Sequence, residues 1–190
     1  MRTRVLFACF LLAACGSRAE QPATVAEKEA AQVEAVKTLS GWNRVFASPV
    51  ETVGSINQAG FGLPTYAAAN GAYGARGIDR LMSRSTAPSP NMATASVSGS
   101  TADRIDQISY VVKLNDPADA ATARERFAQT VAEFLTRAQI TGGEPVLAAI
   151  REGRSAQPTV AGLPVNVTAT PTRVDVTFLR PAATGAPANS

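Results

Sequence analysis

The side chains that most often carry out catalysis are scarce in this chain. It contains no histidine, which removes Ser-His-Asp and Cys-His activation, the usual neutral-pH general base and the usual zinc or haem ligands. Its lysines, Lys28, Lys37 and Lys113, stand in no Ser-x-x-Lys frame. Any catalytic set would therefore have to be built from other groups.

Carboxylate-only catalysis is the chemistry that this inventory still allows. The nearest acid–base candidate is Asp116 with Asp119, and this pair is better explained as the cap and first turn of a helix. Glycines at positions 71, 74 and 77 match neither phosphate-binding fingerprint. We therefore predict no catalytic residue, no metal, no cofactor and a protein that is not an enzyme.

The first fifteen residues carry a more specific signal. Arg2 and Arg4 precede an uncharged run, residues 5–14, which has the length of a signal-peptide core and is too short to span a bilayer. The run ends Leu12-Ala13-Ala14-Cys15, which resembles the lipobox of bacterial lipoproteins. This resemblance, which covers only the leader, implies cleavage between Ala14 and Cys15 and acylation of Cys15. The alternative is an ordinary secretory signal with a chance cysteine.

The same resemblance implies a location. Two or three acyl chains, at about 0.8 kcal/mol per buried CH₂, hold a protein on a membrane durably. In lipoproteins of many diderm bacteria, an aspartate after the cysteine favours retention at the inner membrane. Gly16 stands there, so the resemblance implies the outer membrane, facing the periplasm.

The net charge and the cysteines of the expected mature chain limit the classes of partner that it could bind. Removal of residues 1–14 takes away Arg2 and Arg4, so the formal charge falls from +3 to +1. This near-neutral balance argues against a nucleic-acid partner. Cys9 leaves with the leader and Cys15 carries lipid, so no free thiol is expected. The partners we expect are the membrane, through the N-terminal lipid, and another envelope protein.

Composition divides the chain into six segments. They are a signal peptide (1–14), a lipidated tether (15–24), an N-terminal helical region (25–61), a flexible loop rich in Gly, Ala, Ser and Pro (62–92), an α+β domain (93–181) and a disordered tail (182–190).

Periodicity predicts the elements of the α+β domain. Residues 105–114 alternate as a strand and are followed by Asp116-Pro117, a helix start. The helix that follows has one apolar stripe: Ala120, Ala123, Phe127, Val131, Phe134, Leu135 and Ala138. Further strands are predicted near 93–98, 165–169 and 174–178, and a short helix begins at Pro145. The order is β-β-α-α-β-β: a four-stranded, mostly antiparallel sheet with the long helix on one face.

Two helical patterns precede this domain. Val25, Val33, Val36 and Leu39 mark a weak stripe, which either docks on the domain or stands off as a solvated stalk. Ser48-Pro49-Val50-Glu51 reads as a capping box that opens a helix burying Val50, Val53 and Ile56. The neighbouring aromatics Trp42, Phe46 and Phe61 are expected to pack this helix onto the core.

The face of the sheet opposite the long helix should be polar. Its expected members are Gln107, Ser109, Lys113, Asn166, Thr168, Asp175 and Thr177. We take Gln107, Ser109 and Thr177 as a candidate partner surface, although such faces are usually only solvated. The sequence favours a lipid-anchored binding or assembly module. The alternatives are a carrier with a cavity between helix and sheet, and a carboxylate-type enzyme.

Overall fold

The structure of this chain is a computed structural model that describes residues 34, 38–69 and 71–181. The leader, Cys15 and the tail lie outside these residues, so the predictions made for them keep that status. In the described part, no helix is long and apolar enough to cross a membrane.

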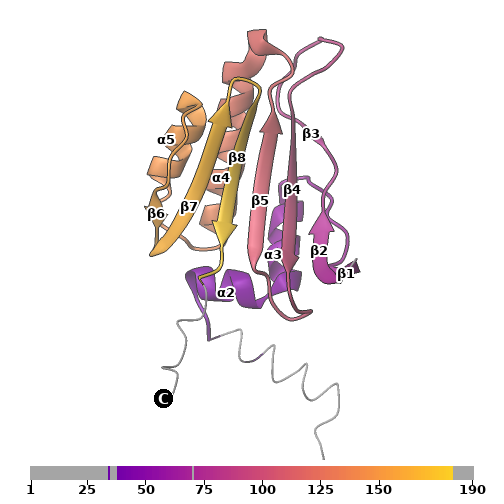
Figure 1. The fold of residues 1–190 in the computed structure, drawn as a ribbon, viewed down its shortest axis with the longest axis vertical. Coiled ribbons are helices and arrows are strands. Elements are labelled where there is room, and N and C mark those ends of the chain that lie inside the picture. Colours follow the sequence, from indigo (N-terminus) through magenta and orange to yellow (C-terminus); the bar gives the residue numbers. More distant parts are fainter. Residues whose placement is uncertain (1–33, 35–37, 70, 182–190) are drawn as a thin grey trace, which may run out of the picture.

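The described residues form one antiparallel sheet with helices packed on one of its faces (Figure 1). The helices are α2 (Gly41–Ala47), α3 (Pro49–Gln58), α4 (Ala120–Arg137) and α5 (Glu144–Glu152), and a 3-10 turn, η1 (Pro117–Asp119), leads into α4. The strands are β1 (Ala67–Ala69), β2 (Ala72–Arg76), β3 (Arg80–Leu81), β4 (Met92–Gly99), β5 (Gln107–Lys113), β6 (Thr159–Val160), β7 (Leu163–Thr170) and β8 (Arg173–Leu179). The predicted α+β class is confirmed.

The sheet is larger than the sequence predicted, because it has eight strands instead of four. Their order is β1-β2-β4-β5-β8-β7-β6, and β3 also pairs with β4. The four expected strands, β4, β5, β7 and β8, are its centre, and the two predicted hairpins are present as antiparallel pairs. The segment 62–92, expected as a flexible loop, instead supplies β1, β2 and β3, so that prediction was wrong.

Alternation along β5 explains its position in the core. Ile108, Tyr110 and Val112 are fully buried, and the residues between them face the other side of the sheet. The long helix packs against this buried side with the predicted stripe, of which Phe127 and Phe134 are 0% and 1% exposed. The register predicted for α4 is therefore confirmed.

Helices α2 and α3 belong to the same core as the sheet. The rings of Trp42 and Phe178 lie 5.1 Å apart, and the Trp42 indole N–H donates to the carbonyl of Val160 at 2.8 Å. The backbone N–H of Ile105 donates to the carbonyl of Phe46 at 2.8 Å. The expected packing role of these aromatics is confirmed, and residues 38–61 join the domain that was predicted to begin at 93.

The start of α3 differs from the prediction in two ways. Ser48 makes no side-chain cap, and Glu51 pairs with Arg44 at 2.8 Å instead of reaching back to the helix start, so neither half of the predicted capping box forms. Val50 is 82% exposed, and Thr52 takes the buried position with its hydroxyl donating to the Val45 carbonyl at 2.7 Å. Pro49 does begin the helix, as predicted, and Val53 and Ile56 are buried.

Candidate functional site

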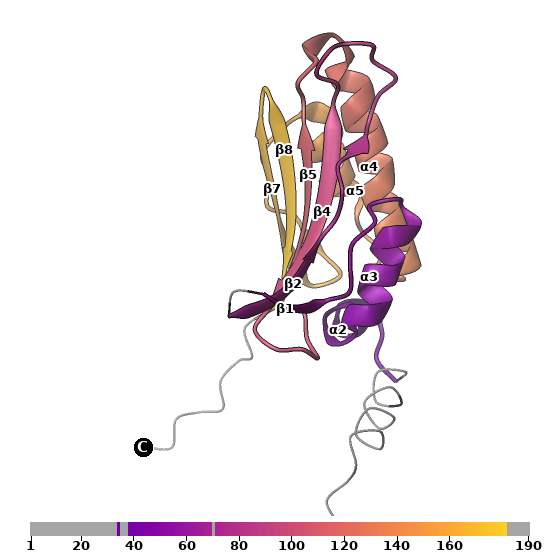
Figure 2. The ribbon, with the colours of Figure 1, turned by 90° about the vertical axis from the view of Figure 1, so that its right-hand side faces the viewer.

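The candidate site is the face of the sheet that the helices leave open. Figure 2 shows α3, α4 and α5 against one face, with no described element layered over the other. The structure brings the three predicted partner residues together there. Ser109 on β5 is directly opposite Thr177 on β8, and Gln107 donates its amide N–H to the Ser109 hydroxyl at 2.8 Å.

Strand register extends this face in rows of short polar side chains. Thr177 pairs in turn with Asn166, and Ser109 pairs with Ser96 on the other side, so one row crosses four strands. The next row joins Thr94, Asp175 and Thr168 with the apolar Val111, and Thr94 is buried with its hydroxyl donating to the Gly77 carbonyl. All seven polar residues predicted for this face lie on it. We call this side of the sheet, formed by the two rows and the seven predicted residues, the open face.

One contributor to the open face was missed by the sequence reasoning. Arg76 on β2 pairs with Ser96 and so continues the row of Ser109 and Thr177. It was overlooked because its segment was expected to be a loop. The signal that could have found it is Asn70-Gly71, since this dipeptide between two short runs favours a two-residue hairpin turn.

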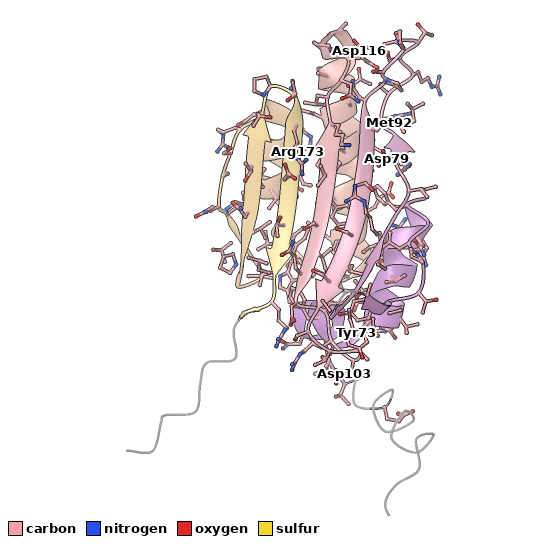
Figure 3. All side chains as sticks on the ribbon, turned by 45° about the vertical axis from the view of Figure 1, so that its right-hand side comes forward. Tyr73, Asp79, Met92, Asp103, Asp116 and Arg173 are labelled. Carbon is pink, nitrogen blue, oxygen red and sulfur yellow. The ribbon has the colours of Figure 1, made fainter. Side chains whose placement is uncertain are left out.

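Charge on the open face is sparse and partly paired. Arg173 and Asp175 form a bidentate ion pair with both contacts at 2.6 Å. Hydrogen bonding to Asp175 raises the pKa of the Arg173 guanidinium. Figure 3 shows Arg173 on β8 and Met92 on β4, the strands that flank β5. Lys113, between these two residues in register, makes no ion pair with any described residue. The face therefore offers many hydroxyl and amide groups and few fixed charges.

Of the two nearest acid–base candidates, Asp116 makes hydrogen bonds that serve the fold, whereas Asp119 makes no side-chain cap at the start of α4. The Asp116 carboxylate accepts a hydrogen bond from the Ala118 backbone N–H at 3.1 Å and another from the Ser85 hydroxyl. The Asp116 backbone also exchanges hydrogen bonds with the buried side chain of Asn91, at 2.8 and 3.0 Å. These bonds fasten the segment before β4 to the start of η1, and Figure 3 shows Asp116 at that end of the molecule. The predicted cap is confirmed at Asp116.

Three grooves on the surface can be compared for the acidic side chains that line them. The first, about 570 Å³, lies between α3 and the end of α4 and has Glu51 as its acidic residue. The second, about 540 Å³, adjoins the start of α4 and has Asp119. The third, about 660 Å³, lies beside α2 and its lining has no acidic residue. None of the three brings together the two carboxylates that glycosidase-type chemistry requires.

The layer between α4 and the sheet is filled by aromatic rings. Tyr110 lies 5.6 Å from Phe134 and 6.4 Å from Phe178, measured between ring centroids, and Phe134 and Phe178 lie 5.9 Å apart. The small side chain of Ala123 lets the helix approach closely and is fully buried. A ligand carried between helix and sheet would have to displace these rings.

Within residues 34, 38–69 and 71–181, no three His, Cys, Asp or Glu side chains gather as a metal site. Comparison with protein-family models, with curated proteins and with solved structures finds no match.

Proposed function

We propose that this chain is a lipid-anchored, non-enzymatic binding or assembly module of the bacterial envelope, attached to the outer membrane and facing the periplasm. The anchor part of the proposal rests on Leu12-Ala13-Ala14-Cys15 and its resemblance to lipoprotein leaders. The binding part rests on one observation, the open face, which is left uncovered while every described helix packs on the opposite side.

The chemistry of the open face favours a protein partner held by hydrogen bonds. Hydroxyl and amide groups of Ser96, Ser109, Asn166 and Thr177 lie in one row across four strands, where each can donate and accept. A pleated row of this kind suits an extended or flat polar surface. We do not propose a carrier, because aromatic rings occupy the space between α4 and the sheet.

The test compares capture by matched variants. The full chain is immobilised in membrane vesicles, and envelope proteins that bind are identified for the wild type and for the triple variant Gln107→Ala, Ser109→Ala, Thr177→Val. We expect at least one protein to be lost with the triple variant while the melting temperature changes little. The Gln107–Ser109 hydrogen bond loses both partners at once, which is nearly neutral for stability.

The control changes exposed polar residues on the helix side, Gln129→Ala with Thr136→Ala. This variant should capture the same proteins as the wild type. If both variants and the wild type retain an identical set, the open face is only solvated and the binding proposal is wrong.

A further inference from the structure

The third groove, which we call the base groove, combines an apolar lining with a cation that makes no ion pair with any described residue. Its apolar lining consists of Ala47, Ala161 and Pro181, which keep exposed surface, and of Trp42, Phe46 and Leu163, which are almost fully buried. Arg104 and Arg180 also line it. It lies at the end of the molecule that holds α2, opposite the end marked by Asp116; Asp103, the neighbour of Arg104, is labelled there in Figure 3.

The two arginines of the base groove differ in their partners. Arg180 is held by Asp106, whose Oδ1 accepts from its guanidinium at 2.7 and 2.9 Å. Arg104 makes no ion pair with an acidic residue of the described part. The base groove therefore has room for a carboxylate beside Arg104.

The base groove is lined by residues close in sequence to both terminal segments that the structure does not describe, 1–33 and 182–190. Leu39 and Ser40 line it on the N-terminal side and Pro181 on the C-terminal side. Residues 182–190 have neither a charged side chain nor a large apolar one, so they do not match a groove of this kind. The segment 25–37 has both.

The pattern of residues 25–37 is complementary to the base groove. Val25, Glu29, Val33 and Val36 follow one another at i, i+4, i+8 and i+11, which places a carboxylate within the apolar stripe of the predicted helix. A carboxylate on a packed apolar face is costly unless it meets a cation. Gly41 has φ +54 and Ser40 is extended, so the chain changes direction just before α2. Residues 25–37 can therefore run in a different direction from the axis of α2.

We propose that residues 25–37 dock in the base groove as a helix, with the valines against the partly exposed apolar residues of its lining and Glu29 paired to Arg104. Docking has a consequence for the anchor proposed above. Fully extended, the chain from Cys15 to Leu39 could reach about 80 Å, whereas residues 15–24 alone reach about 30 Å. Docking therefore keeps the domain, with its open face, close to the membrane. The contact itself does not require acylation, so it can be tested separately.

The test measures hydrogen–deuterium exchange of the amides of residues 25–37 in the full chain, held in micelles of an uncharged detergent. We expect protection from exchange in the wild type. Glu29→Gln and Arg104→Gln should each reduce this protection about three- to fivefold, the effect of removing a partly exposed ion pair. The exchanged pair Glu29→Arg with Arg104→Glu should restore it.

Glu27→Gln is the matched control, because Glu27 lies on the opposite side of the predicted helix and should leave protection unchanged. Glu29 lies outside the residues that the structure describes, so Glu29→Gln still tests the contact if Arg104→Gln fails to fold. The proposal is wrong if residues 25–37 exchange as fast as the same amides in an isolated peptide, or if both glutamate variants lose protection equally. It is also wrong if protection appears only with vesicles containing phosphatidylglycerol, because the segment would then bind lipid.

Discussion

The buried hydroxyl of Tyr110 is the clearest anomaly at the scale of single residues. Tyr110 is 0% exposed, its hydroxyl has no hydrogen-bond partner among the described residues, and burial raises the pKa of the phenol well above its usual value. A buried polar group without a partner costs about 1–3 kcal/mol. We therefore expect Tyr110→Phe to leave the free energy of unfolding unchanged or to increase it, as measured by urea denaturation.

Tyr66 provides the matched control for Tyr110. Its hydroxyl donates to the carbonyl of Arg104 at 2.8 Å and lies 3.2 Å from that of Thr101. Tyr66→Phe should therefore cost about 0.5–1.5 kcal/mol. If Tyr110→Phe were the more damaging of the two changes, the Tyr110 hydroxyl would have a partner after all.

The apolar stripe of α4 gives a second prediction at this scale. Phe127 and Phe134 are buried, so replacing either with alanine should cost about 3–5 kcal/mol through lost contacts and the cavity left behind. Gln129 is exposed, and its alanine variant should change the unfolding free energy by less than about 0.5 kcal/mol. Thermal denaturation of the three variants separates these outcomes, and similar losses at all three sites would contradict the observed register.

At the scale of elements, alanine substitution at two glycines, Gly77 and Gly54, should change stability in opposite directions. A Cβ added at Gly77, in the bend between β2 and β3, would lie 2.5 Å from the Phe61 carbonyl oxygen. Gly77→Ala should therefore displace backbone and lower stability. Gly54, inside α3, has nothing within 4 Å of an added Cβ, so Gly54→Ala should stabilise by about 0.5–1 kcal/mol. Chemical denaturation of both variants measures the difference, and a stabilised Gly77→Ala would show that this bend is not tightly packed.

The elements with strong periodicity were predictable, and those without it were not. Strands β4, β5, β7 and β8 alternate cleanly, and α4 repeats its apolar residues every three or four positions. Strands β1 and β2 consist mainly of alanine and glycine, which lack the β-branched side chains that mark a strand. What holds β2 is pairing with β4, a contact between distant positions that the local sequence does not encode.

The same distinction applies to the open face. Alternation alone placed Gln107, Ser109 and Thr177 on one side of the sheet, because side chains in a strand have a period of two. That Ser109 is directly opposite Thr177 depends on the register between β5 and β8. The seven-residue match between those strands reflects packing of their buried faces, which one sequence does not specify.

At the scale of the whole molecule, Asp106 joins the two ends of the loop between β4 and β5 to Arg180, which follows β8. Its carboxylate accepts from the Ser100 backbone at 2.7 Å and from Arg180, and its carbonyl accepts from the Arg180 N–H at 2.8 Å. Burial, which raises the Asp106 pKa, is outweighed by hydrogen bonds from Ser100 and Arg180, so the pKa lies below 3.8.

This shift gives a pH dependence with a definite sign. Because the folded-state pKa of Asp106 is lowered, its contribution to stability is complete above pH 3.8 and is lost as pH falls through the lower, folded-state pKa. Asp106→Asn removes that contribution. We expect the variant to be less stable near neutrality and to lose less stability than the wild type on acidification below pH 3.8, measured by urea denaturation across pH. Parallel pH profiles would mean that the hydrogen bonds of the Asp106 carboxylate do not affect stability.

The proposed leader would determine where such a domain acts, so Cys15 is the residue on which the proposed location depends. If Cys15 receives a diacylglycerol, the chain stays with the membrane, because transfer of two or three acyl chains to water is prohibitively costly. Cys15→Ser should abolish labelling by a fatty-acid analogue and move the protein from the membrane fraction to the soluble fraction. Cys9→Ser is the matched control, since Cys9 lies within the segment expected to be removed and should leave labelling unchanged. Undiminished labelling of Cys15→Ser would contradict the anchor, whereas loss of the label with retained membrane binding would indicate a second contact with the membrane.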